Sequence, residues 1–327
     1  MDRMKHLDLQ VIQQGIAWLE EGRPVWLSTV LATFGSAPRG PGSMLVAASN
    51  GESRGSLSGG CVEEDFLERV SASGFSKLTE VVRYGEGGLA PNLALPCGGA
   101  LDVLVEHFTP GNESLNHFQH IADALSGSRC IGRVISVGTG IKRIVSTETK
   151  QARVTRSESE VTILVGPAKR LIVAGFSPVA EHCAIFAVAL GFEVIVCDPR
   201  PEQVAQAQRV LRNVQVLEVI PALFIEQGGS HAETAIVALT HDPRLDDLTL
   251  MESIRTEAFY IGAMGSTRTS IKRLERLARI GGFTHEQKQR IHAPIGLNLG
   301  SKTPAEIAIA VMADVIRVGN GVLRDAL

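Results

Sequence analysis

The chain has 327 residues, more than the roughly 250 at which a single hydrophobic core stops growing, so we expect two domains. Its 44% hydrophobic and 20% charged residues are typical of a globular protein. A formal net charge of −3 gives no electrostatic reason to expect nucleic acid or a membrane surface as a partner. The chain starts with polar residues and no apolar run approaches the ~18 residues of a membrane span, so we expect a cytoplasmic protein.

The first 110 residues mix helical and strand patterns and predict an α+β domain over 1–110. In chain order we expect a helix that ends near Gly22, strands over 24–33 and 43–48, a hairpin turn at Asn50-Gly51, a helix over 62–70, and strands over 79–84 and 101–108. Residues 111–160 have weaker patterns, with one helix around 115–125, and we treat them as a variable bridge.

From 161 to 327 strands alternate with helices, which predicts a Rossmann-like domain with a doubly wound parallel sheet. The expected strands cover 169–175, 192–198, 214–219, 233–240 and 258–265, with helices over 177–190, 203–211, 244–255, 267–279 and 303–319. The fold class is therefore α/β, an α+β domain followed by a Rossmann-like domain.

The segment GSLSGGCVE at 55–63 places a thiol on a glycine-rich loop at the start of the expected helix. Gly59 and Gly60 leave backbone amides and the sulfur of Cys61 uncovered, and Glu63 lies in the first helical turn. A helix N-terminus lowers the pKa of a thiol, and thiolates bind soft metals or attack electrophiles. The alternative interpretation is a structural turn in which cysteine is simply a small residue that fits.

Two further loops of the first domain have similar chemistry. LPCGG places Cys97 before Gly98 and Gly99, and GSAPRGPG carries Arg39 and Gly42. The planar guanidinium of an arginine suits phosphate or carboxylate. We expect the intervening strands to bring these loops and the Cys61 loop together.

The segment VAGFSPVAEHC resembles the first turn of a dinucleotide-binding fold. Read against G-x-G-x-x-G/A, the turn has Gly175, Ser177 and Ala180, and Asp198 ends the next strand, where a ribose hydroxyl would bind. Ser177 replaces the glycine that lets a pyrophosphate approach the backbone. We therefore favour a turn that is kept for packing, and we do not expect NAD(P) or FAD as a cofactor.

A second glycine turn, YIGAMGSTRTS, follows a later strand. Gly262, Gly265 and Ser266 are expected between a strand and a helix, with Arg268 in the first helical turn. Open amides and an arginine at that place would bind an anion, and a plain turn with a solvated arginine is equally compatible.

The remaining cysteines and histidines give weaker signals. The five cysteines form no C-x-x-C pair, which argues against a disulfide framework and a zinc ribbon. Cys183 and Cys197 lie in apolar patterns and are expected in the core. His241 and His292 have no spacing that pairs them with a cysteine, and His241-Asp242 alone is a weak metal signal.

Five segments in one order, GSAPRGPGSM, GSLSGGCVEE, LPCGG, YIGAMGSTRT and IHAPIGLNLGSKTPAEIAIAVMADVI, resemble the XdhC/CoxI family of xanthine dehydrogenase accessory factors. The stretch VWLSTVLATFGSAPRGPGSM looks closest to members that serve aldehyde oxidoreductases. The chain departs from many members, which read G-x-G-H at the Rossmann turn, because Ser177 and Pro178 occupy the last two of those positions.

The resemblance implies a maturation and insertion chaperone, not an enzyme. Such proteins bind molybdenum cofactor, as molybdopterin or its cytosine dinucleotide, while a cysteine desulfurase supplies the terminal sulfur, and pass it to an apo-molybdoenzyme of the xanthine oxidase type. A cofactor nucleotidyltransferase is a further implied partner, and the family commonly forms homodimers.

The resemblance also implies site residues, by match to the family's motifs. The cofactor-binding positions are Arg39, Gly42, Gly59, Gly60, Cys61, Glu63, Cys97, Gly98, Gly99, Gly262, Gly265, Ser266 and Arg268. We hypothesise that Cys61, and with it Cys97, contacts molybdenum or relays sulfur. Other functions stay open: an NAD(P)-dependent oxidoreductase, a thiol-dependent sulfurtransferase, or a scaffold without a cofactor.

Overall fold

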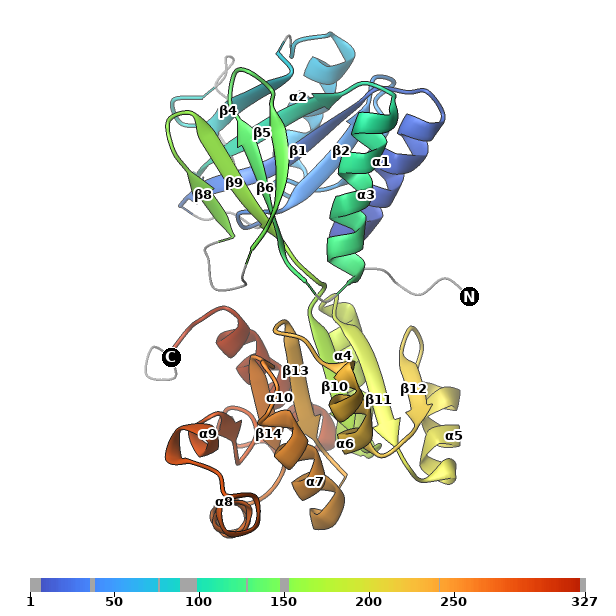
Figure 1. Cartoon of the computed structure of the whole chain (residues 1–327), viewed down its shortest axis with the longest axis vertical. Coiled ribbons are helices and arrows are strands. Elements are labelled where there is room, and N and C mark those ends of the chain that lie inside the picture. The colour runs from blue at the N-terminus through green and yellow to red at the C-terminus, as the bar shows by residue number, and fades with distance from the viewer. Residues whose placement is uncertain are drawn as a thin grey trace. The chain divides into compact units, whose positions relative to one another are not determined.

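The chain divides into two compact units, Leu7–Pro167 and, in the second half, Ala168–Leu327 (Figure 1). The structure, a computed structural model, describes residues 7–35, 39–75, 77–88, 99–127, 129–147, 153–240 and 242–323. The expected fold class, an α+β part followed by a Rossmann-like part, is confirmed. The finer division into 1–110, a bridge at 111–160 and 161–327 stays a prediction. Within the described ranges no helix is long and apolar enough to cross a membrane.

The Leu7–Pro167 unit is built on a five-stranded antiparallel sheet, here called sheet A, with strand order β3-β2-β1-β5-β4. Its strands are β1 (Val25–Phe34), β2 (Met44–Ala48), β3 (Ser53–Gly55), β4 (Thr79–Gly85) and β5 (Ala100–Phe108). The hairpin expected at Asn50-Gly51 joins β2 to β3, where the Ala48 amide donates to the Glu52 carbonyl at 2.9 Å and Gly51 has a φ of 85°.

A second antiparallel sheet, here called sheet B, comes from the region expected to be a bridge. Its order is β7-β6-β9-β8, with β6 (Ile131–Ser136), β7 (Lys142–Ser146), β8 (Val154–Arg156) and β9 (Glu160–Val165). Alternate side chains of β9, Val161, Ile163 and Val165, are buried in the same core as the first unit's helices. This period-two burial is that of a strand with one face against a core.

Sheet A has apolar side chains on both faces, and different elements pack on each face. Helices α1 (Leu7–Glu20) and α3 (Asn112–Ser126) pack with sheet B on one face, around Leu27, Val46 and Leu104. Helix α2 (Cys61–Ser71) packs on the other face through Val62, Phe66 and Val70, against residues such as Val30 and Val103. Successive side chains of β1 point to opposite faces of the sheet, so neighbouring residues pack against different elements.

The Ala168–Leu327 unit is a six-stranded parallel sheet in the order β12-β11-β10-β13-β14-β15. Numbered from β10, this is the order 3-2-1-4-5-6 of dinucleotide-binding folds. The strands are β10 (Arg170–Ala174), β11 (Glu193–Asp198), β12 (Gln215–Glu218), β13 (Thr234–Ala238), β14 (Tyr260–Ala263) and β15 (Ile291–His292). The first five confirm expected strands, whereas the two-residue β15 is too short to leave a pattern.

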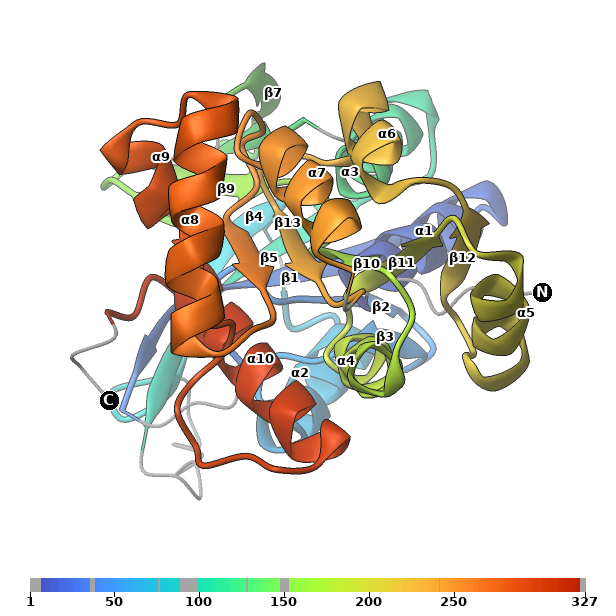
Figure 2. The same ribbon diagram turned by 90° about the horizontal axis from the view of Figure 1, so that it is seen from below.

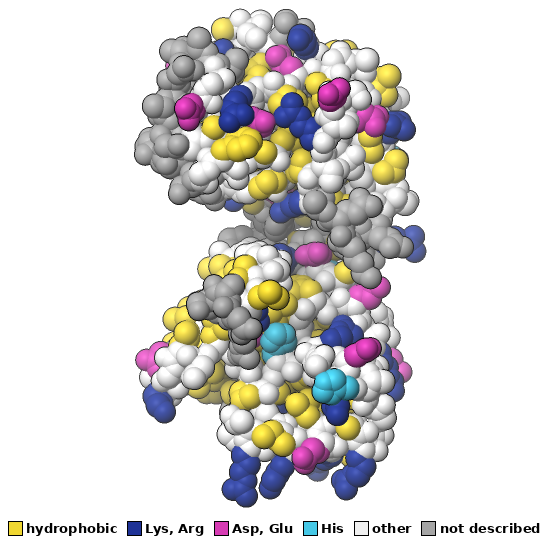
Figure 3. Space-filling model, turned by 90° about the vertical axis from the view of Figure 1, so that its left-hand side faces the viewer, with side chains coloured by type: hydrophobic (Ala, Val, Ile, Leu, Met, Phe, Trp, Pro, Cys, Tyr) yellow, Lys and Arg dark blue, Asp and Glu magenta, His cyan; other side chains and the backbone are white. Residues whose placement is uncertain are grey.

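Helices cover both faces of this sheet (Figure 2). One face packs on α4 (Pro178–Ala189), α5 (Pro201–Val210) and α10 (Pro304–Gly319), and the other on α7 (Pro243–Ser253) and α8 (Thr267–Gly281). Three short segments complete the unit, α6 (Pro221–Phe224), the π-helical turn Ile225–Gly229 and α9 (His285–Gln289). On the face shown in Figure 3, Lys and Arg side chains gather along the lower edge of this unit and mix with acidic ones elsewhere.

Candidate functional site

The antiparallel order of sheet A brings the three predicted loops to one end of it. At this end, which we call the loop end, β1 finishes at Phe34, β4 finishes at Gly85 and β5 begins at Ala100, and these three positions lie side by side in the ladder. β2 begins and β3 finishes at the same end, with Gly55 paired to Leu45. The loops at 35–43, 56–60 and 86–99 therefore all leave sheet A at its loop end.

Two of these loops touch through glycines. A Cβ at Gly35 would lie 3.3 Å from the Cα of Gly99, and one at Gly85 would collide with the Gly99 carbonyl. Gly35 and Gly85 both have positive φ, 77° and 90°, so only glycine allows this close approach without strain. Gly99 is thus placed against the start of the Arg39 loop, as expected, whereas Cys97 and Gly98 lie outside the described residues.

The loop before α2 is organised by the carboxylate of Glu63. Its oxygens accept six hydrogen bonds, from the hydroxyls of Ser56 (2.7 Å) and Ser58 (2.6 Å) and from the amides of residues 57–60 (2.8–3.2 Å). Gly59 and Gly60 have φ of 89° and 137°, a left-handed path that turns their amides toward this point. The expectation that amides converge here is met, but their resident anion is Glu63.

This arrangement fixes the charge of Glu63 and the start of the helix. Partial burial opposes ionisation, but hydrogen bonds from Ser58, Ser56 and Leu57 outweigh it and lower the pKa of Glu63 far below its ordinary value. Cys61 is the first residue of α2, as the sequence predicted, and its side chain lies outside what the structure describes. The amides of this loop are already satisfied, so a cofactor phosphate would have to compete with Glu63 for them.

The Arg39 loop supplies a cation with an unused donor. The Nε atom of Arg39 is buried and has no hydrogen-bond partner among the described residues. Gly42, with φ of 87°, lies under Arg153, and a Cβ there would be 2.5 Å from the Arg153 Nε. Arg153 also pairs with Asp8 at 3.0 Å. This loop therefore combines one unpaired guanidinium nitrogen with a glycine that the Arg153 side chain covers.

Sequence reasoning missed two other arginines at the loop end. Arg83 of β4 and Arg156 of β8 both pair with Asp102, at 3.7 Å and 3.1 Å, and Arg83 also lies 4.4 Å from the ring centroid of Phe34. Arg153 and Arg156 come from the region expected to be a bridge. The alternating sequence EVTILV at 160–165 could have predicted the strand β9, which pairs with β8 and thereby positions these two arginines.

The Rossmann turn has its polar groups engaged within the protein. Ser177 caps α4 by accepting from the Ala180 amide at 3.2 Å, and Ala180 itself is fully buried. Asp198 accepts from the Phe176 amide at 2.7 Å and from two guanidinium nitrogens of Arg200 at 2.9 and 2.7 Å. The carboxylate that would hold a ribose is thus bound twice by Arg200.

The first glycine of that turn serves packing. Gly175 has a φ of 86°, and a Cβ there would collide with Thr240. Its amide donates to the Cys197 carbonyl at 2.8 Å. This agrees with the interpretation favoured from the sequence, a turn kept for packing.

The second glycine turn differs in one detail from the expectation. Gly262 lies inside β14, not between strand and helix, and a Cβ there would meet Ile295 at 2.6 Å. Gly265 follows the strand, and Ser266 caps α8 by accepting from the Thr269 amide at 3.2 Å. Arg268 is exposed in the first turn of α8, as predicted.

The other cysteines and histidines have structural settings where the structure describes them. Cys183 and Cys197 are fully buried, and burial raises the pKa of each to about 12, which confirms them as core residues. His292 stacks on Tyr260 and contacts Asp314 at 3.3 Å. His241 lies outside the described residues. No group of three or more metal-ligand residues occurs among those that are described.

Two family models match the chain. The XdhC and CoxI family matches residues 18–85, which include the Arg39 and Glu63 loops, and the XdhC Rossmann domain matches residues 171–315. The chain belongs to the XdhC and CoxI family. One model falls in each half of the chain, and together they include the turns at Gly42, Gly59, Gly175 and Gly265.

Named relatives of this XdhC-family chain align over nearly its whole length. A probable subunit of xanthine dehydrogenase from Bacillus subtilis (strain 168) is 27% identical over 92% of the chain and 95% of its own length. The molybdenum cofactor insertion chaperone PaoD of Escherichia coli (strain K12) is 26% identical over 94% of the chain and 87% of its own length. A solved structure from Bacillus halodurans, described as a xanthine dehydrogenase, shares the fold with a TM-score of 0.73 at 22% identity over 98% of both chains.

Proposed function

We propose that this XdhC-family protein is a molybdenum cofactor-binding chaperone, not an enzyme. It holds the cofactor, in its dinucleotide form, while a cysteine desulfurase adds the terminal sulfur, and inserts it into an apo-molybdoenzyme of the xanthine dehydrogenase type. A cofactor nucleotidyltransferase supplies the cargo, and the chaperone works as a homodimer in the cytoplasm. The insertion chaperone named among its relatives supports the general role.

The observation that carries the proposal is the chemistry gathered at the loop end of sheet A. Molybdenum cofactor is a polyanion with a soft metal–sulfur centre. Arg39 offers a buried guanidinium nitrogen without a partner among the described residues, and Arg83 and Arg156 share one carboxylate, so the loop end has donors to spare for phosphate oxygens. A thiol at a helix N-terminus, the position of Cys61, suits the metal–sulfur end.

Each loop has a separate part in this proposal. Arg39 and Gly42 hold phosphate, Cys61 with Cys97 contacts the metal or relays sulfur, and Glu63 keeps the Cys61 loop in shape. Gly59, Gly60, Gly98 and Gly99 leave room for close approach. In the Rossmann unit, the turn with Gly265, Ser266 and Arg268, which follows Gly262 of β14, is a secondary anion site, and the exposed Arg268 is its cation.

The test is to produce the protein in cells that make molybdenum cofactor and measure what it retains. We expect molybdenum, and a pterin that fluoresces after oxidation, in the purified wild-type protein. Cys61→Ala should lose most of both, and Cys97→Ala at least part. Cys130→Ala, which removes a half-buried thiol elsewhere in the same unit, is the matched control and should retain wild-type amounts.

Two results would contradict the proposal. If the wild-type protein purifies from such cells without molybdenum or pterin, it does not hold the cofactor and the chaperone role is wrong. Retention that Cys61→Ala and Cys97→Ala leave unchanged would remove the thiols from the site, even if the cofactor binds elsewhere.

A further inference from the structure

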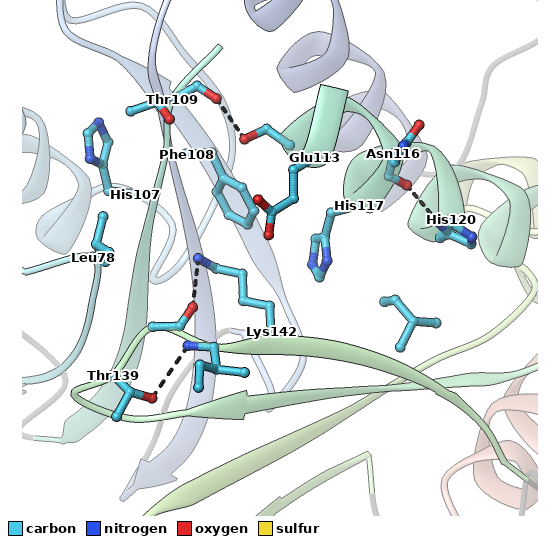
Figure 4. Close-up of a pocket in the computed structure, with 14 residues that line it drawn as sticks. Leu78, His107, Phe108, Thr109, Glu113, Asn116, His117, His120, Thr139 and Lys142 are labelled. Atoms are coloured by element: carbon cyan, nitrogen blue, oxygen red, sulfur yellow. Dashed lines mark hydrogen bonds between the residues drawn. The ribbon is translucent and has the colours of Figure 1, made fainter. Parts of the chain in front are cut away.

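A cavity of about 490 Å³ opens between the end of β5, the first turns of α3 and the turn that joins β6 to β7 (Figure 4). This volume is typical of small-molecule sites. The cavity lies at the end of sheet A opposite the loop end, because β5 finishes here at Phe108 and β4 begins at Thr79. None of the residues assigned above to the cofactor lines it.

The side chain of Lys142 reaches into the middle of this cavity (Figure 4). Its ammonium lies 4.4 Å from the ring centroid of Phe108 and donates one long hydrogen bond, 3.5 Å, to the carbonyl of Gly140. Within the described part of the chain no carboxylate comes within 4.0 Å of it. An ammonium has three donors, and a partly buried charge costs free energy unless it is paired, so Lys142 has capacity for an anion.

The buried carboxylate that acts on Lys142 is Glu106, and it already has a partner. Glu106 pairs with Arg133 at 2.7 Å, and both side chains are completely buried. Burial, and then the neighbouring Arg133, lower the pKa of Lys142, while Glu106 and the exposed Glu113 act in the other direction. Glu106 therefore balances Arg133. Glu113 also lines the cavity but forms no ion pair with Lys142 within 4.0 Å, so Lys142 remains as a partly buried cation that faces the cavity.

His117 adds a neutral ring to the same wall. Burial, and then the Arg133 charge, lower its pKa to about 2, and its Nε2 accepts from the Arg133 Nε at 3.4 Å. The ring is therefore uncharged at neutral pH and does not compete with Lys142 for an anion. Apolar side chains supply much of the remaining surface, namely Leu78, Phe108, Ile141 and Ile144.

We propose that this cavity binds a small organic oxyanion, a carboxylate or phosphate on an apolar or ring-shaped body, with Lys142 as its anchoring cation. The acid group bonds the ammonium in place of the exposed Glu113 carboxylate, which Figure 4 shows between Phe108 and His117, and the body lies against the aliphatic side chains. This site is separate from the cofactor site at the loop end, so either stands without the other.

The test uses benzoate and phenyl phosphate as probes, with benzyl alcohol as the uncharged analogue. Binding to the full chain is measured by calorimetry, and its location by the NMR shifts of the His117 ring. We expect saturable binding of at least one acid, and the one that binds more tightly identifies the acid group. Lys142→Met should weaken that binding about tenfold or more, since a hydrogen bond to a charged group is lost.

Arg143→Met is the matched control. Arg143 is the next residue of β7, pairs with Glu160 at 2.8 Å and does not line the cavity, so its loss should leave probe binding unchanged. Equal binding of benzyl alcohol and the acids would overturn the proposal, as would binding that Lys142→Met does not weaken. If neither acid binds saturably up to about 10 mM, the proposal is also overturned, because the binding free energy is then weaker than about 3 kcal/mol.

Discussion

At the residue scale, Glu63 explains why a loop with so many glycines has one shape. Its carboxylate accepts the amides of residues 57–60 together with two serine hydroxyls, so one charged group satisfies donors that a loop would otherwise expose. The same contacts fix where α2 begins and therefore where Cys61 is presented. Glu63 is thus a positioning residue for the proposed thiol.

We expect Glu63→Gln to destabilise the protein by about 2 kcal/mol, because an amide nitrogen replaces one acceptor and faces donors instead. Partial exposure of the Glu63 side chain to solvent limits this loss of stability. Glu64→Gln is the matched control: it is exposed in the same helical turn and should cost less than about 0.5 kcal/mol. Urea unfolding of the variants measures both; equal costs would show that the Glu63 network contributes nothing.

The pH dependence of this network has a definite sign. The folded-state pKa of Glu63 is lowered from the ordinary 4.5, so its stabilisation is complete above pH 4.5 and is lost as the pH falls below that value. The difference in unfolding free energy between wild type and Glu63→Gln should therefore shrink in acid. Unfolding curves at pH 7, 5 and 3.5 would measure it, and a difference that grows toward pH 3.5 would contradict the account.

At the element scale, strand and helix patterns predicted most of sheet A and of the parallel sheet, because their strands are continuous apolar runs bounded by turn residues, whereas sheet B lies in the region treated as a bridge. Helix α10, expected over 303–319, begins with a capping box of Thr303 and Glu306. The patterns failed where an element is short or half-exposed, as in β8 and β15. Such strands form because they pair with a neighbouring strand, and a local sequence pattern contains no information about that neighbour.

The side-chain contacts at the candidate site could likewise not be predicted from the sequence. Strand direction alone decides that the loops at 35–43, 56–60 and 86–99 leave sheet A at one end, whereas the expected meeting of Arg39, Cys61 and Cys97 stays a prediction. The sequence does not predict that the Glu63 carboxylate accepts the amides of its own loop, or that the Arg200 guanidinium pairs with Asp198, because both contacts depend on rotamers and register. Glycine spacing indicates where amides converge, but not which anion they bind.

For the Rossmann turn, we expect no saturable change in NADH fluorescence up to about 100 µM, because Asp198 is held by Arg200 and Ser177 is used as a cap. Ser177→Gly restores the glycine at that position and should still not bind, since Asp198 remains engaged. Nicotinamide fluorescence is the readout, because Trp18 and Trp26 both belong to the other unit. Micromolar binding by the wild type would instead support the oxidoreductase alternative.

At the scale of the whole molecule, the chain consists of two units with separate hydrophobic cores. The cores of Leu7–Pro167 lie on the two faces of sheet A, and those of Ala168–Leu327 on the two faces of the parallel sheet. We therefore expect fragments 7–167 and 168–327 each to fold alone. Cooperative thermal unfolding by circular dichroism would be the evidence, and a fragment without a transition would contradict this division.

The division also locates the proposed activity. If the loop end of sheet A binds the cofactor, fragment 7–167 carries the main site, and the Rossmann unit contributes only the turn around Gly265 and Arg268. The resemblance to the family was visible in both units, but the physical case for a cofactor differs between them: among the described residues, the first has a buried cationic donor to spare, and the second has its turn satisfied internally.

Hydrogen exchange of the chain with and without bound molybdenum cofactor decides whether the loop end of sheet A holds the cofactor. We expect exchange to slow mainly in peptides over 35–43, 55–63 and 86–99, at one end of sheet A. Exchange over 175–180 and 198–200 should stay the same. Protection confined to those Rossmann segments, with no change at the three loops, would contradict it.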